Sequence, residues 1–158
     1  MEFDVYDELN QLYIRALIYT YFNNFLKESE GVKLNLGCGV DYIKDCINVD
    51  IGRYSKADVI FDLNNKDWLW ESESMLCVYC YDIIEHLDNI IEFMEQIWKV
   101  LKKNGKVMIR TNNAACLQSF ADPTHKHFFT EGSFDLFDPS TFFGQKYNWY
   151  TDKKFTIL

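Results

Sequence analysis

Two glycines follow directly on an apolar segment in the first third of the chain. The stretch from Leu34 to Val40 reads LNLGCGV, which places Gly37 and Gly39 on either side of Cys38. Glycine has no Cβ atom, so a ligand can approach its backbone closely, and the N–H groups of such a loop can donate hydrogen bonds. Plain tight turns use the same pattern, so other residues must decide whether this loop binds a ligand.

Two carboxylates stand at the ends of the next two apolar segments. Asp50 closes the run INVD, and Asp62 with Leu63 closes the run ADVIFDL. An acid at the end of a strand beside a glycine loop can accept hydrogen bonds from both hydroxyls of a ribose. Asp62 could accept from an exocyclic amine while Leu63 packs on a purine, although each acid could instead cap a turn. The three strand ends together favour a ligand that contains a nucleoside.

Titratable side chains after residue 112 could act on a second substrate. Asp122, His125 and His127 lie there among several phenylalanines. A histidine changes its charge near neutral pH, so it can take a proton from a hydroxyl group. Either histidine could equally bond to a backbone carbonyl and hold the loop in place. His125 and His127 are therefore the candidate catalytic bases, and His86 is expected to be structural or to support the site indirectly.

The five cysteines predict neither a metal site nor a disulfide framework. Their number is odd and they are scattered between Cys38 and Cys116, unlike the cysteines of a disulfide scaffold. Cys77 and Cys80 form a Cys-x-x-Cys in the strand-like run MLCVYC, where positions three apart point to opposite faces. Two such thiols cannot share a metal ion. No metal ligands are expected.

Five short apolar segments predict strands that are buried on both faces, as in a parallel sheet. They span residues 32–36, 47–51, 57–63, 75–80 and 105–111. The segment 37–46 is too short for a full crossover helix between the first two strands. A long helix is predicted before the fifth strand, beginning at a capping box over residues 82–85. An amphipathic helix is predicted over about residues 5–26.

The chain of 158 residues has the size of one domain. We expect a leading helix (1–30), a nucleoside-binding core (32–112) and a region that faces the second substrate (113–158). Its 16 basic and 24 acidic side chains give a net charge of −8, which disfavours nucleic acid as a partner. No leader pattern and no membrane-length apolar run are recognised, so a cytoplasmic protein without membrane contact is expected.

Five motifs, LNLGCG, INVDI, DVIFDLN, YDIIEHL and VLKKNGKVMIRT, resemble in order and spacing those of class I S-adenosylmethionine-dependent methyltransferases, in particular small type 11-like domains. The resemblance covers about residues 32–112. It implies a Rossmann-like, mostly parallel α/β sheet with helices on both faces and a reversed C-terminal hairpin. It also implies S-adenosylmethionine as the cofactor.

The cofactor-binding residues that the resemblance implies all follow the ends of the first four strands. They are Gly37, Cys38 and Gly39 under the methionine, Asp50 and Ile51 at the ribose, Asp62 and Leu63 at the adenine, and Cys80 and Tyr81 beside the amino group and the sulfonium.

Three features depart from the common pattern of that family. Asp41 stands where many members have a third glycine, and the short early crossovers suggest a more open cofactor site. A dinucleotide-binding loop would need a glycine at Tyr42, which argues against a nicotinamide cofactor. The final segment KKFTIL predicts one strand where the closing hairpin needs two. The hairpin is thus incomplete, or a partner chain such as a second copy in a homodimer completes it.

The activity expected from this resemblance is methylation of a hydroxyl on a small molecule or a glycan. One alternative is a non-catalytic methyltransferase-like module that serves as a partner subunit. Another is an aminopropyl transferase that uses the same nucleoside pocket, with acids around Asp82 assisting an amine.

Overall fold

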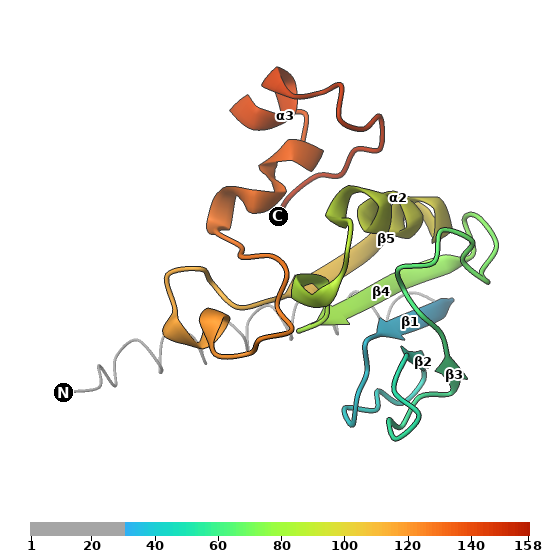
Figure 1. The fold of residues 1–158 in the computed structure, drawn as a ribbon. Coiled ribbons are helices and arrows are strands. Elements are labelled where there is room, and N and C mark those ends of the chain that lie inside the picture. Colours follow the sequence, from blue (N-terminus) through green and yellow to red (C-terminus); the bar gives the residue numbers. More distant parts are fainter. Residues whose placement is uncertain (1–30) are drawn as a thin grey trace. The chain divides into compact units, whose positions relative to one another are not determined.

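The computed structural model describes residues 31–158. The chain divides into two units, Met1–Gly31 and Val32–Leu158, and the sheet belongs to the second unit. The helix predicted over about residues 5–26 lies outside the described residues. Figure 1 shows the second unit from β1 to the C terminus.

The second unit is built on a sheet of five parallel strands. They are β1 (Val32–Leu36), β2 (Ile47–Asp50), β3 (Val59–Ile60), β4 (Met75–Tyr81) and β5 (Leu101–Arg110), in the order β3-β2-β1-β4-β5. The central strands are buried on both faces, as their continuous apolar runs predict. The α/β Rossmann-like architecture is thereby confirmed.

Two strand boundaries differ from the prediction. β3 is limited to Val59–Ile60, because Asp58 before it binds the backbone of β2 and Asp62 after it forms a turn with the N–H of Asn64. β5 begins at Leu101, directly after a helix, and not at residue 105. Opposite β4 its register skips from Leu101 to Lys106, so the residues between them bulge out of the ladder.

The connections between β1, β2 and β3 contain no helix, which confirms the shortened early crossovers. A buried amide network fastens these loops instead. The Asn48 side chain accepts from the Asn35 side chain and from the Ile43 N–H, each at 2.9 Å, and donates to Asp58 at 3.0 Å. Asn48 is fully buried, so its hydrogen bonds must be satisfied within the protein. This network holds the loops that follow β1 and β2.

The helix α2 (Ile90–Val100) is shorter than predicted and starts later. The side chain of Asn89 caps it by accepting from the N–H groups of Ile91 and Glu92. The predicted capping box at residues 82–85 is wrong, since a separate 3-10 turn, η1 (Ile84–His86), occupies this place. Asp82, the predicted cap residue, has a φ of 52° and donates its N–H to the carbonyl of Arg110 on β5.

One buried face of α2 packs into the core with the sheet. Phe93, Met94, Ile97 and Val100 share this core with Leu34 and other strand residues. Figure 1 shows α2 lying along β4 and β5. A helical layer on the second face of the sheet stays a prediction, because the helix expected before residue 31 is not among the described residues.

The region after β5 consists of short helical turns joined by loops. They are η2 (Leu117–Phe120), η3 (Glu131–Phe137) and α3 (Phe142–Lys146). The strand predicted at KKFTIL is wrong: these residues form no ladder. Phe155 donates its N–H to the carbonyl of Phe137, and Ile157 donates to Asp138, so the segment runs beside η3. No helix in the described part has the length and apolar character required to span a bilayer.

Candidate functional site

The order of the strands creates a crevice at one edge of the sheet. The chain moves outward from β1 through β2 to β3, then returns to the other side of β1 with β4 and β5. In parallel α/β sheets, ligands bind at the carboxyl ends of the strands where the order reverses. Gly37 follows β1 and Asp82 follows β4 at this position.

The two glycines after β1 have different surroundings. Both have positive φ angles, 68° for Gly37 and 49° for Gly39. A Cβ atom on Gly37 would lie 2.5 Å from the side chain of Ile83, so this glycine permits close packing against the chain after β4. A Cβ atom on Gly39 would meet nothing within 4 Å. Gly39 therefore borders open space that a ligand could occupy.

Asp50 at the end of β2 is held by the backbone on both carboxylate oxygens. Oδ2 accepts from the N–H of Gly39 at 2.8 Å, and Oδ1 accepts from the N–H of Gly52 at 2.6 Å. A carboxylate oxygen has a second acceptor position, so both oxygens can still bind hydroxyl groups. The neighbouring Ile51 is 62% exposed and offers an apolar surface. The remaining acceptor positions of Asp50 and the open space at Gly39 fit a ligand that contains a nucleoside.

Of four other predicted cofactor residues, three have buried side chains and one is exposed. Leu63 and Cys80 are buried within the apolar core, and Cys38 is also buried. Burial raises the pKa of the Cys80 thiol and that of Cys38, which keeps both thiols neutral. Asp62 is exposed and accepts from the N–H of Asn64. The cofactor contacts of these four residues stay predictions.

Tyr81 and Asp82 are joined to β5 by a cationic side chain. The guanidinium of Arg110 pairs with Asp82 and lies 4.8 Å from the ring centre of Tyr81. The hydrogen bond to Asp82 raises the pKa of Arg110 above its usual value. The Tyr81 hydroxyl lies 2.8 Å from the sulfur of Met108. These contacts fix the end of β4 beside the crevice.

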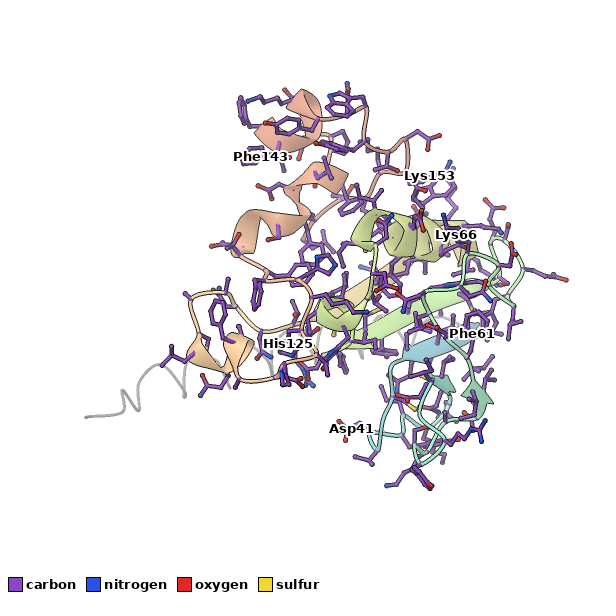
Figure 2. All side chains as sticks on the ribbon, viewed as in Figure 1. Asp41, Phe61, Lys66, His125, Phe143 and Lys153 are labelled. Atoms are coloured by element: carbon purple, nitrogen blue, oxygen red, sulfur yellow. The ribbon has the colours of Figure 1, made fainter. Side chains whose placement is uncertain are left out.

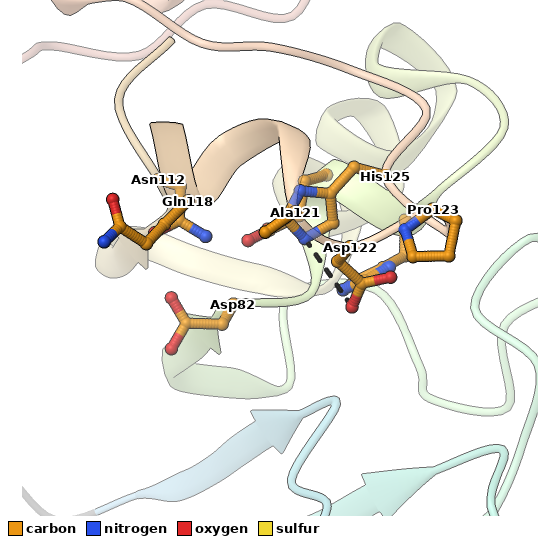
Figure 3. A pocket seen from close by; sticks show the side chains of 9 residues that line it. Asp82, Asn112, Gln118, Ala121, Asp122, Pro123 and His125 are labelled. Atoms are coloured by element: carbon orange, nitrogen blue, oxygen red, sulfur yellow. Dashed lines mark ion pairs between the residues drawn. The ribbon is translucent and has the colours of Figure 1, made fainter. Parts of the chain in front are cut away.

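An open cleft of ≈ 580 Å³ lies beyond the carboxyl ends of β4 and β5. Its walls come from η1, from the chain just after β5 and from the loop after η2. Figure 3 shows this cleft. The lining residues are Asp82, Glu85, His86, Asn112, Gln118, Ala121, Asp122, Pro123 and His125.

His125 has one ring nitrogen fixed and the other available. Its Nδ1 lies 2.7 Å from the carbonyl oxygen of Ser119. A carbonyl only accepts hydrogen bonds, so Nδ1 carries the proton in this contact, and Nε2 of the neutral ring keeps its lone pair. Nε2 lies 4.0 Å from a carboxylate oxygen of Asp122. The prediction that His125 bonds to a backbone carbonyl is therefore confirmed, and this bond leaves Nε2 available.

His86 is oriented in the same way by a hydroxyl group. Thr124 donates its one hydroxyl hydrogen to Asp122 at 2.6 Å, so its oxygen accepts from Nδ1 of His86 at 3.0 Å. The hydrogen bonds from Thr124 also lower the pKa of Asp122, which keeps this carboxylate charged. The His86 and His125 rings meet edge to face, 4.8 Å between centres. The sequence predicts a structural role for His86 or one that supports the site indirectly, and the structure places it in the lining of the cleft.

His127 is not among the residues that line the cleft. Its backbone N–H and that of Lys126 both donate to the carbonyl of Glu85, at 3.2 and 2.8 Å. These bonds tie the loop after η2 to η1. Among the described residues, the buried Nε2 of His127 has no hydrogen-bond partner. Of the two predicted bases, only His125 therefore lines the cleft.

The sequence analysis missed Glu85 and Asn112 as cleft residues. The available signal was the pattern Asp-x-x-Glu-His directly after a strand, which places polar groups at the ligand-binding edge of the sheet. Its interpretation as a helix capping box concealed this. Glu85 is only 2% exposed, and no described residue bonds to either of its carboxylate oxygens.

Comparison with known structures supports the same fold. The chain is similar to a SAM-dependent methyltransferase from Archaeoglobus fulgidus, with a TM-score of 0.61 and 18% identity, covering 84% of this chain and 72% of that one. It is also similar to the YcgJ protein of Bacillus subtilis, with a TM-score of 0.54 and 16% identity, covering 67% of this chain but only 58% of that one. No curated protein matches the sequence.

A family model described as a methyltransferase domain matches residues 10–154, almost the whole chain. S-adenosylmethionine is the cofactor of this family. The acceptor oxygens of Asp50, beside the open space at Gly39, fit the ribose hydroxyls of its nucleoside. The chain belongs to the methyltransferase-domain family.

Proposed function

We propose that the protein transfers a methyl group from S-adenosylmethionine to a hydroxyl group of a small molecule or a glycan. The observation that carries this proposal is the cleft beyond β4 and β5. It lies next to the strand reversal, and its lining includes His125, whose Nδ1 bonds to the Ser119 carbonyl and leaves Nε2 for a substrate. The cofactor and the acceptor would thus meet near the end of β4.

Gly39 and Asp50 would hold the cofactor. Gly39 leaves room for the methionine portion, and the Asp50 carboxylate is oriented by two N–H groups to accept from the ribose hydroxyls. Ile51 and Asp62 would lie along the adenine. When bound, S-adenosylmethionine supplies a methyl group already activated by the sulfonium charge, so the residues must align the acceptor and exclude water.

His125 would activate the acceptor hydroxyl through Nε2. In its simplest form this is general-base catalysis: the hydroxyl proton moves to Nε2 as the new oxygen–carbon bond forms and the carbon–sulfur bond breaks. Ser119 keeps the imidazole in the tautomer that can accept this proton. His127 would support the loop rather than the reaction.

A hydroxyl acceptor without a phosphate suits the charges around the cleft. Asp82, Glu85 and Asp122 contribute carboxylates, and no lysine or arginine of the described part of the chain lines the cleft. The net charge of the chain is −8. Anionic polymers such as nucleic acids would be repelled, whereas sugar and phenol hydroxyls can donate to these carboxylates.

The binding test is calorimetric titration of S-adenosylmethionine into the full chain. We expect one binding site, and Asp50→Ala should weaken it at least about 10-fold through loss of the ribose contacts. Asp67→Ala, an exposed acid outside the crevice, is the matched control. No binding at millimolar cofactor, or equal affinities of Asp50→Ala and the wild type, would contradict the proposal.

The acceptor test supplies methyl-labelled cofactor with panels of sugars, phenols and amines. Label should appear on a hydroxyl compound. For that compound, His125→Gln should lower kcat about 100-fold while leaving the affinity for S-adenosylmethionine unchanged. Transfer only to amines, or an aminopropyl product by mass, would replace the proposal with one of its alternatives.

A second candidate function is a partner-binding module, which exposed aromatic rings around α3 favour. Phe142, Phe143, Trp149 and Tyr150 are all exposed, and Figure 2 labels Phe143 on α3. Such a patch is typical of a protein interface. We propose a second copy of the chain as the partner. Sedimentation should then show a dimer that Trp149→Ser weakens, and a monomer at high concentration would contradict it.

A cytoplasmic location is proposed on the basis of the thiols. All five cysteines are free, including Cys116 at the surface, and exposed thiols persist in a reducing compartment.

A further inference from the structure

We propose that Glu85, His86 and His125 bind one divalent transition-metal ion of the zinc class in the wall of the cleft. One carboxylate oxygen and one ring nitrogen from each histidine lie within 4.8 Å of one another. All three side chains line the same cleft. Two histidines and one glutamate are the ligand set of open, catalytic zinc sites, where the fourth position takes water or substrate.

The Glu85 carboxylate is the strongest reason to place a cation here. The residue is only 2% exposed, and no described residue forms a hydrogen bond with either carboxylate oxygen. A buried carboxylate without a partner is strongly unfavourable, and a bound cation removes that cost. Among residues 31–158, no lysine or arginine lines the cleft to serve as a partner.

Both histidines are prepared as ligands. The Nδ1 proton of His125 is donated to the Ser119 carbonyl, and that of His86 to the Thr124 hydroxyl, which in turn donates to Asp122. Histidines that bind metals usually donate their other ring nitrogen in this way, which fixes the tautomer and the ring plane. In both rings Nε2 is left with the lone pair that a metal needs.

The loop after η2 brings the three ligands together. The N–H groups of Lys126 and His127 donate to the carbonyl of Glu85, and Lys126 pairs with Asp88 through its side chain at 2.6 Å. Ligand atoms around a tetrahedral ion are about 3.4 Å apart, given bonds of about 2.1 Å. A small shift of η1 toward the loop after η2 would close the remaining gap.

This inference deepens the proposed function and rests on it for the role of the cleft. Nε2 cannot hold an ion and a proton together, so His125 would activate the hydroxyl as a ligand. The acceptor oxygen would take the open position on the ion, which lowers the pKa of the hydroxyl. Its proton would pass to solvent or to Asp122, whose charged carboxylate lies 4.0 Å from Nε2.

The test measures metal binding alone, without cofactor or acceptor. The full chain is stripped with a chelator, then titrated with Zn²⁺ by calorimetry and with Co²⁺ by visible absorption. We expect one ion per chain. Glu85→Gln and His125→Gln should each weaken it at least about 100-fold, and Thr124→Val, which removes only an outer hydrogen bond, about 10-fold. Mg²⁺ should bind far more weakly, since it prefers oxygen ligands.

Cys116→Ser is the matched control. Cys116 is exposed, and its sulfur lies 2.7 Å from the Gln118 side chain, which also lines the cleft. Its thiol is therefore the rival zinc ligand. Cys116→Ser should bind Zn²⁺ like the wild type. Binding that is lost in Cys116→Ser, or that Glu85→Gln and His125→Gln retain in full, would overturn the proposal.

Thermal unfolding separates lost binding from lost folding. At 100 times its dissociation constant, Zn²⁺ should raise the Tm of the wild type by about 5 to 10 °C. Stripped Glu85→Gln should melt no lower than the stripped wild type, because glutamine keeps the size and shape of the buried side chain, and should not respond to Zn²⁺. Absence of any Zn²⁺-dependent rise in the wild type would overturn the metal site. Cofactor binding would remain a separate measurement.

Discussion

The residues of the crevice show that one short motif can serve two purposes. Gly37 and Gly39 have similar φ angles, yet Ile83 fills the space beside Gly37 while the space beside Gly39 is open. The first glycine is needed for packing, and the second borders open space. Asp50 holds the second in place, because its carboxylate accepts from the N–H of Gly39.

Alanine substitutions at these glycines should therefore separate stability from binding. Gly37→Ala combines a left-handed backbone with a clash and should lower the free energy of unfolding by about 3 kcal/mol. Gly39→Ala should cost only about 1 kcal/mol but weaken S-adenosylmethionine binding, since its methyl group enters the open space. Urea unfolding and calorimetry measure the two effects. Equal losses of stability would show that Ile83 does not pack as described.

Among the elements, α2 illustrates how a neighbouring turn can imitate a helix start. Asp82 and Glu85 match the capping-box spacing, but Asp82 pairs with Arg110 on β5 and Glu85 is buried in the wall of the cleft. Asn89, seven residues later, supplies the actual cap. The segment that could have extended the helix is used for the site instead.

The helix cap can be tested by comparing two substitutions. Asn89→Ala should lower the free energy of unfolding by about 1 kcal/mol, because two N–H groups of α2 lose their acceptor. Asp82→Asn should change it by less than about 0.5 kcal/mol, since its ion pair with Arg110 is exposed and asparagine tolerates a positive φ. An Asn89→Ala variant as stable as the wild type in urea unfolding would contradict the cap at Asn89.

At the scale of the whole second unit, a buried carboxylate fastens the C-terminal segment. Asp138 accepts from the N–H groups of Ile157 at 2.7 Å and Ser140 at 2.8 Å. Phe155 adds a backbone bond to Phe137 and an edge-to-face ring contact with it. These contacts hold the last residues beside η3.

This fastening should make stability depend on pH. The hydrogen bond from Ile157, followed by those from Ser140, lowers the pKa of Asp138 below its usual value. The folded state therefore gains stability above the unfolded pKa of about 3.9, and loses it as pH falls through the lower folded pKa. Asp138→Asn should be less stable than the wild type at pH 7. The difference should shrink below pH 4 in urea unfolding, and an unchanged difference would contradict the prediction.

The sequence by itself determined the parallel sheet and the shortened early crossovers. Continuous apolar runs mark strands buried on both faces, and parallel strands must bring Gly39 and Asp50 to the same edge. These features depend on the local hydrophobic pattern and on the lengths of the strand connections, and both can be read from residues close together in the sequence. The exact ends of β3 and β5 did not follow, because side chains from other segments compete with the ladder there.

Only the tertiary structure decided which histidine lines the cleft and what surrounds it. His125 and His127 are two residues apart, yet it is the side chain of His125, and not that of His127, that groups with the side chains of His86 and Glu85, 39 and 40 residues earlier. The predicted final strand failed for the same reason, since Phe137 and Asp138 offer the segment better partners than a sheet edge. Contacts between distant segments depend on the packing of the loop after η2 against η1, and no local pattern records that packing.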